Sequence, residues 1–133
     1  MHIKKVLVLD DENYRHNYYK KLYSNCEYFE ARNAKTAIEL LENEADIDLL
    51  HLDFDLFKTP HAPNEYLTGL AVVEYIIYKL DRNKIPKQIK VHSWNNKGHA
   101  QMMKILSLHK LKPISEYFPE EAIPFFDETN EVK

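Results

Sequence analysis

Apolar and polar positions follow two alternating patterns along this chain. Short continuous apolar runs are typical of strands buried on both faces of a parallel sheet. Between them lie segments whose apolar residues repeat at helical spacing. The apolar runs predict strands at residues 3–9, 26–31, 47–53 and 89–92, and a fifth strand at either 111–114 or 114–118.

The helical segments occupy the intervals between these strands. In the first, Tyr14, Tyr18 and Leu22 recur every four residues and predict one buried face. Asn33 is a candidate N-cap for the second helix, and Asn95 or Asn96 is a candidate for the fourth. The segments predict helices at about 12–24, from Asn33 through Leu41, at 68–80 with Leu70, Val73, Ile77 and Leu80 buried, and from Asn95 or Asn96 to His109.

Strands that alternate with helices imply right-handed parallel crossovers. The fold class is therefore α/β, a doubly wound (flavodoxin-like) parallel five-stranded sheet in a single domain. We assign residues 1–126 to this domain and residues 127–133 to an acidic, frayed C-terminal tail. A long polar loop at 54–67, which contains two prolines, is of a length that is often functional.

Composition narrows the class of protein. The 133 residues are 44% apolar and 29% charged with a net charge of −3, which is typical of a soluble globular domain and gives no global signal for nucleic-acid binding. A lone Cys26, no signal-peptide pattern and no apolar run long enough for a bilayer predict a cytoplasmic protein that does not contact membranes. With only two glycines the chain has no glycine-rich phosphate loop, so a phosphate would be held by side chains, a metal or helix ends.

Carboxylates follow two of the predicted strands. Asp10 and Asp11 end the first apolar run, and Asp53 and Asp55 end the third. Because ligands of open α/β sheets bind at the carboxyl ends of the strands, these side chains would crowd one place and need a cation. Helix capping is the alternative, and it explains one aspartate at each strand end but not the doublet. Asp10, Asp11 and Asp53 are thus the candidate ligands of Mg²⁺ or a similar ion.

A third polar cluster follows the fourth strand. His92 could act as a general acid or base, and Ser93 could donate a hydrogen bond to a phosphoryl oxygen. Asn95 could do the same or cap the next helix. A buried histidine beside an ordinary Ser/Asn cap is the alternative interpretation. Trp94 could stack on a base, although one tryptophan is weak support.

Arg15 lies one helical turn beyond Asp11. It could bind a phosphate, bind a carboxylate of the cluster, or form only an exposed salt bridge. His51, His61 and His99 have no metal-ligand spacing, and we assign them structural roles.

The order of strands, helices and acidic ends resembles the receiver domain of bacterial two-component systems. The resemblance implies that Asp10, Asp11 and Asp53 hold Mg²⁺, that Asp53 accepts a phosphoryl group, and that Ser93 is the hydroxyl after the fourth strand. The separation between Asp53 and Ser93 is longer than is usual in receivers. Lys112 is the only candidate for the lysine that receivers have after the fifth strand.

A closer resemblance, over nearly the whole chain, is to the cyclic-phosphate processing receiver domains. The motifs that carry it are Leu9-Asp10-Asp11-Glu12 with Arg15, Leu52-Asp53-Phe54-Asp55-Leu56, Thr68-Gly69-Leu70, and His92-Ser93-Trp94-Asn95 followed by Gly98, Ala100 and Met103. The family usually has a histidine where this chain has Phe54.

This resemblance implies an enzyme that processes cyclic phosphates of RNA ends or nucleotides. Asp10, Asp11 and Asp53 would hold Mg²⁺ or Mn²⁺, while His92 would protonate the leaving oxygen or activate water. The catalytic residues would thus be His92, Asp53 and Arg15. The phosphoryl oxygens would be held by three side chains: Arg15, Ser93 and Asn95. Two alternatives stay open, a phosphoacceptor modified at Asp53 and an inactive nucleotide binder, and by analogy with receivers a homodimer could form through the fourth helix.

Overall fold

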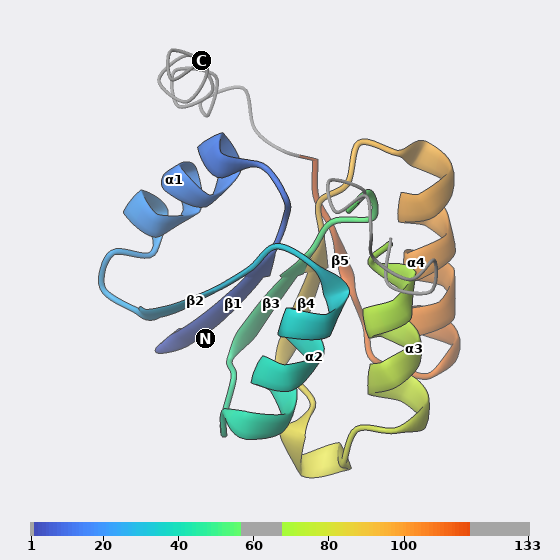
Figure 1. Ribbon diagram of the computed structural model, residues 1–133. Helices are drawn as coiled ribbons and strands as arrows, with labels where there is room; N and C mark the ends of the chain where they lie inside the picture. Colours follow the sequence, from blue (N-terminus) through green and yellow to red (C-terminus); the bar gives the residue numbers. More distant parts are fainter. Residues whose placement is uncertain (1, 57–67, 118–133) are drawn as a thin grey trace.

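The computed structural model describes residues 2–56 and 68–117 of the chain (Figure 1). His61, most of the predicted 54–67 loop and the predicted tail 127–133 lie outside these residues. In chain order the elements are β1 (Lys5–Leu9), α1 (Asn13–Leu22), β2 (Glu27–Ala31), α2 (Ala34–Asn43), β3 (Leu49–Leu52), α3 (Leu70–Tyr78), the 3₁₀ turn η2 (Arg82–Lys84), β4 (Gln88–Val91), α4 (Asn96–Leu108) and β5 (Ile114–Ser115).

The five strands form one parallel sheet in the order β2-β1-β3-β4-β5, which confirms the predicted fold class. In the register Leu9 lies opposite both Ala31 and Leu52, and Leu52 lies opposite Val91. β1, β3 and β4 therefore end at the same level, and the residues that follow them meet at one edge of the sheet.

Helices α2, α3 and α4 cover one face of the sheet, and their apolar residues form the main core (Figure 1). Strand residues Leu7, Leu50 and Val91 point into this core and are fully buried. The N-cap prediction for α2 is confirmed, because the Asn33 side chain accepts a hydrogen bond from the Thr36 amide at 2.8 Å. Helix α3 buries Val72, Val73 and Ile76. Of the residues predicted to be buried, Val73 is buried, whereas Leu70 and Ile77 are only partly buried.

Helix α1 packs on the opposite face, where the contacts are more polar. The predicted stripe of this helix is confirmed only in part: Tyr14 and Tyr18 pack against the core, whereas Leu22 is 55% exposed. The buried residues of the helix are Arg15, His16 and Tyr19. The physical reason is that this face of the sheet presents His51 and His92 to the helix as well as the aliphatic residues Val6, Val8 and Leu49. The Tyr19 ring lies 4.5 Å from the His51 ring, centroid to centroid, and is 5.6 Å from that of His92.

The short strand β5 decides between the two predicted positions, because it begins at Ile114. Lys112 therefore precedes β5 and lies toward the amino end of the strand, so it cannot take the place of the lysine that follows the fifth strand in receivers. The prediction for Lys112 is wrong. No helix of the described residues is long and apolar enough to cross a membrane.

Candidate functional site

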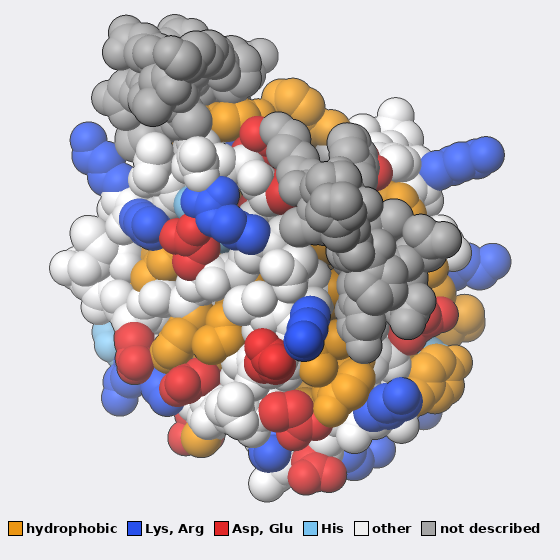
Figure 2. Space-filling model, in the orientation of Figure 1, with side chains coloured by type: hydrophobic (Ala, Val, Ile, Leu, Met, Phe, Trp, Pro, Cys, Tyr) orange, Lys and Arg blue, Asp and Glu red, His pale blue; other side chains and the backbone are white. Residues whose placement is uncertain are grey.

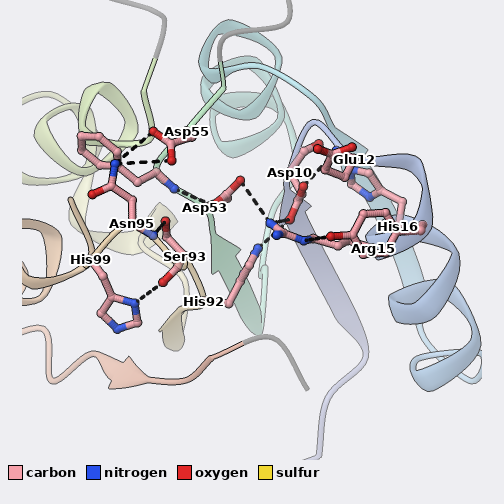
Figure 3. Close-up of polar contacts among 12 residues, drawn as sticks. Asp10, Glu12, Arg15, His16, Asp53, Asp55, His92, Ser93, Asn95 and His99 are labelled. Carbon is pink, nitrogen blue, oxygen red and sulfur yellow. Dashed lines mark hydrogen bonds and ion pairs between the residues drawn. The ribbon is translucent and has the colours of Figure 1, made fainter. Parts of the chain in front are cut away.

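The ends of β1, β3 and β4 bring three predicted site residues together. Asp10, Asp53 and His92 each offer one ligand atom, and these atoms lie within 4.8 Å of one another (Figure 3). Asp10 and His92 have no exposed surface, and Asp53 is 3% exposed. The structure thus confirms that residues far apart in the sequence converge at this edge, as the strand register requires.

Asp10 is surrounded by hydrogen-bond donors. Its Oδ1 accepts from the Glu12 amide at 2.9 Å, and its Oδ2 accepts from His92 Nε2 at 2.9 Å and from Arg15 Nη1 at 3.2 Å. Burial disfavours the charged form, but the His92 hydrogen bond and charge, with the charge of Arg15, outweigh it and hold the pKa of Asp10 below its usual value. Asp10 is therefore a stable anion at the centre of the cluster.

Arg15 is not the exposed salt bridge that was one alternative. Its guanidinium is buried against the cluster, with Nη1 3.2 Å from Asp10 Oδ2 and 3.6 Å from Asp53 Oδ2. Its Cζ also lies 5.1 Å from the centroid of the Trp94 ring and 5.5 Å from that of Tyr14. Burial opposes its charge, but Asp10 and Asp53 more than compensate and raise the pKa of Arg15.

Asp53 is in the opposite electrostatic situation. One of its oxygens accepts from the Phe54 amide at 2.9 Å, which is few donors for a buried carboxylate. Burial, followed by the negative charge of Asp10, raises the pKa of Asp53 to about 7, although His92 and Arg15 act in the other direction. A carboxylate held in this way gains from a bound cation.

The α3 N-terminus fixes the backbone of Asp53. Gly69 donates its amide hydrogen to Phe54 O at 2.8 Å, and a Cβ at Gly69 would lie 2.0 Å from Asp53 O. This close approach, rather than an unusual dihedral angle, is why glycine is needed in the Thr68-Gly69-Leu70 segment.

A cavity of about 250 Å³ opens beside these groups. Its described lining consists of Asp11, Glu12, Arg15, Asp53, Asp55, Ser93, Trp94 and Asn95. His92 contacts Asp10 but does not line the cavity, and its ring has no exposed surface. In this geometry His92 bonds to Asp10 and is set back from the described lining of the cavity.

The loop after β4 is built around two hydrogen-bonding side chains. Ser93 Oγ accepts from the Asn95 amide at 3.1 Å, which leaves the hydroxyl hydrogen to point toward a ligand. The Asn95 side chain accepts from the Gly98 amide at 2.9 Å and donates to Asp55 at 3.2 Å. Of the two roles left open for Asn95, helix capping is the one that the structure displays.

Phe54, which stands where the family usually has a histidine, packs against α4. A Cβ at Gly98 would lie 2.2 Å from Phe54 Cγ, so the two residues are fitted to each other. Phe54 is not among the described residues that line the cavity. A side chain at this position is directed to the start of α4 instead of the cavity.

Two further histidines support the site, although no pattern in the sequence predicts their contacts with it. His16 Nε2 donates to Asp10 O at 2.8 Å, while its Nδ1 accepts from the Tyr28 hydroxyl at 2.7 Å. His99 Nδ1 donates to Ser93 O at 2.7 Å. No spacing in the sequence could show these contacts, because each joins an α-helix to a strand end that only the fold brings near. His51, as predicted, is structural: it is buried and bonded to the Tyr23 hydroxyl at 2.8 Å.

A divalent cation fits the donor set of this site. Asp11 and Asp53 border the cavity and Asp10 lies immediately behind them, so hard oxygen ligands predominate. The raised pKa of Asp53 is the physical sign that negative charge is under-compensated there. The fit is to a hard ion such as Mg²⁺ or Mn²⁺, with water completing the shell.

The parallel sheet, its strand order and the acidic edge define a receiver-like domain. Solved receiver domains agree: one from Methylobacillus flagellatus is 13% identical with a TM-score of 0.65 and covers 99% of this chain and 100% of its own. A second, from Methanospirillum hungatei, is 15% identical with a TM-score of 0.62 and coverages of 98% and 93%. A third is a response regulator from Burkholderia pseudomallei with a phosphorylated aspartic acid, calcium ion and citrate; it is 13% identical with a TM-score of 0.60 and coverages of 98% and 75%.

The particular family follows from the sequence. The model of the cyclic-phosphate processing receiver domain matches residues 5–108, and the chain belongs to that family. No curated protein sequence matches the chain significantly.

Proposed function

We propose that this protein is a metal-dependent phosphoesterase that opens cyclic phosphates of nucleotides or RNA ends by hydrolysis. One observation carries the proposal: one cavity is lined both by the carboxylates Asp11 and Asp53 and by Arg15 and Ser93, a guanidinium and a hydroxyl that can donate to phosphoryl oxygens. Membership of a family described as processing cyclic phosphates supports the choice of substrate.

In the reaction, water attacks phosphorus, one of the two ester P–O bonds of the ring breaks, and the leaving oxygen takes a proton. A Mg²⁺ or Mn²⁺ ion held by Asp10, Asp11 and Asp53 would polarise the P–O bond and neutralise the developing charge. Arg15 binds a phosphoryl oxygen through its guanidinium, and Ser93 donates its hydroxyl hydrogen to another.

The acid–base chemistry differs from the one expected from the sequence. The titratable groups among the described lining residues are acids and one arginine, while His92 is not among them and is hydrogen-bonded to Asp10. Proton transfer therefore belongs to a carboxyl group or to water instead of an imidazole. Asp53 has a pKa of about 7 without a cation, and a bound cation would lower it, so with the metal in place a metal-bound water is better suited to this proton transfer.

The test is incubation of the purified protein with Mg²⁺ or Mn²⁺ and a panel of 2′,3′-cyclic and 3′,5′-cyclic nucleotides, followed by ³¹P NMR. We expect a phosphomonoester to form, and we expect Asp11→Asn to lose the activity. The matched control is Asp46→Asn, an exposed aspartate away from the cavity, which keeps it. A panel that stays intact in the presence of either metal rejects the proposal.

A phosphoacceptor is the second candidate, because Asp53 follows β3 and a similar fold from Burkholderia pseudomallei holds a phosphorylated aspartic acid. Against it, the described residues after β5 are Glu116 and Tyr117, with no lysine. Incubation with a small phosphodonor and intact mass measurement separates the two: an adduct that disappears in Asp53→Asn supports signalling. Shifts in melting temperature with cyclic nucleotides, without turnover, would identify an inactive binder.

A further inference from the structure

Trp94 is an unusual residue for the edge of a polar cavity. It lies at the rim beside Ser93 and Asn95, and 56% of its surface is exposed. The other large apolar residues of this edge, such as Leu52 and Leu56, are buried. A large exposed aromatic ring at a ligand cavity is a candidate contact for an apolar, flat part of the ligand.

Arg15 helps to hold the indole in place. Arg15 Cζ lies 5.1 Å from the ring centroid, and the same guanidinium is bonded to Asp10 at 3.2 Å. Since the arginine is fixed by a buried carboxylate, the cation–π contact also fixes the ring beside it. A platform ordered before binding loses little entropy when a ligand stacks on it.

The cavity is smaller than is usual for a ligand as large as a nucleotide. Sites for drug-sized ligands are usually about 300–1,000 Å³, whereas this cavity is about 250 Å³. Its interior groups, Arg15, Ser93 and the carboxylates, suit a phosphate with its metal. The remainder of the substrate must then lie at the rim, where Trp94 is.

We infer that Trp94 is the stacking platform for the base of the nucleoside that carries the cyclic phosphate, and that the site recognises this one nucleoside. The inference rests on the proposed function, because it assigns the phosphate end of the same substrate to the cavity. Nucleoside cyclic phosphates, free or at the 3′ end of an RNA, are thus the substrate class, and cyclic phosphates without a base are poor ligands.

The same geometry predicts little discrimination among bases. The amide of Asn95, the described side chain beside Trp94 best suited to hydrogen-bond a base edge, is already bonded to Asp55 and to the Gly98 amide. Stacking alone is tolerant of sequence and favours the larger purine surface. Neighbouring phosphates of an RNA would not be attracted to the described rim, because it carries the acidic residues Asp11, Glu12 and Asp55. Figure 2 shows acidic and basic side chains interspersed on the face in view.

Trp94 is the single tryptophan of the chain, so its fluorescence reports stacking directly. The first experiment titrates the protein, with Mg²⁺ present, with adenosine 2′,3′-cyclic phosphate and with ribose 2′,3′-cyclic phosphate, which has the same reacting ring but no base. We expect saturable quenching by the nucleotide and none by the base-free analogue. Equal affinity for both ligands by calorimetry, without quenching, overturns the inference and leaves the proposed function standing.

The second experiment compares Trp94→Ala with the conservative Trp94→Phe. For the nucleotide we expect KM to rise tenfold or more in the alanine variant and less than threefold in the phenylalanine variant, with kcat nearly unchanged. Both variants should match the wild type on the base-free substrate, which controls for any movement of Arg15. An equal loss on both substrates overturns the inference, since it would assign Trp94 to holding Arg15.

A third arm distinguishes the two sources of the nucleoside. A short RNA with a 2′,3′-cyclic phosphate end should bind no more tightly than the mononucleotide and with a similar dependence on KCl. Binding that is tenfold tighter and steeply weakened by salt overturns the claim that only the terminal nucleoside is recognised. Quenching by the nucleotide without any turnover would instead reject the proposed function, while the inferred stacking of the base on Trp94 would stand.

Discussion

Two aspartates flank the same strand and have opposite electrostatic surroundings. Asp48 precedes β3, where its Oδ2 accepts from the Lys4 and Lys5 amides at 2.8 and 3.0 Å. These hydrogen bonds, helped by Lys87, lower the pKa of Asp48 to about 2. Asp53 follows β3, where burial and the charge of Asp10 raise its pKa to about 7.

The difference shows what each end of the sheet contributes. At the amino end a carboxylate ties the start of β1 to β3 with donors of its own, so its charge stabilises the fold. At the carboxyl end the charges crowd around a cavity and are only partly compensated, so the charge of Asp53 costs stability. Such an arrangement is typical of a site that binds a cation or a reacting group.

The largest effect on stability should come from a substitution that displaces the backbone at the carboxyl end of β3. Gly69→Ala places a Cβ 2.0 Å from Asp53 O, a backbone atom that cannot rotate away. We expect a loss of about 2 kcal/mol in the free energy of unfolding, measured by urea denaturation, and weaker Mg²⁺ binding by calorimetry. Glu74→Ala, an exposed change on the same helix, should stay within about 0.5 kcal/mol. Wild-type stability in the glycine variant would contradict the close approach.

The second largest effect on stability should come from a substitution of Asp48 at the amino end of β3. Asp48→Asn should lower the free energy of unfolding by about 1–2 kcal/mol at pH 7. The folded-state pKa of about 2 lies below the unfolded value of about 3.9. The stabilisation is therefore fully present above about pH 4, and it is lost as the pH falls from about 4 to about 2.

Urea denaturation of the wild type and Asp48→Asn at several pH values measures this difference. Lys87→Ala is the matched control, because Lys87 bonds to the same carboxylate from a side chain that is 59% exposed. It should cost less than about 0.5 kcal/mol. A cost as large as that of Asp48→Asn would assign the stabilisation to the ion pair and not to the two backbone amides.

The smallest effect has the opposite sign. Asp53→Asn removes one of two crowded buried carboxylates and keeps an oxygen for the Phe54 amide, so we expect a gain of about 1 kcal/mol in metal-free buffer. Added Mg²⁺ should raise the melting temperature of the wild type but not of the variant. A variant less stable than the wild type in EDTA would show that Asp53 supports the fold as Asp48 does.

The sequence predicted the sheet, its helices and the main site residues because those depend on local patterns. Continuous apolar runs mark buried parallel strands, and the carboxyl ends of parallel strands share one edge, so Asp10, Asp53 and His92 had to meet. The buried face of α1 was predicted only in part, since Arg15 and Tyr19 are buried through partners on β1, β3 and the β4 end.

What the sequence alone determined is the class of the fold and the set of groups that converge. Only the tertiary structure decided how these groups are arranged. His92 lies behind Asp10, Asn95 caps α4, and Phe54 packs on Gly98, because side-chain direction depends on contacts between elements distant in the chain. The same packing explains the difference between Asp48 and Asp53, which flank one strand. Their pKa values are about 2 and about 7 because the fold brings different hydrogen-bond donors and charges to each carboxylate.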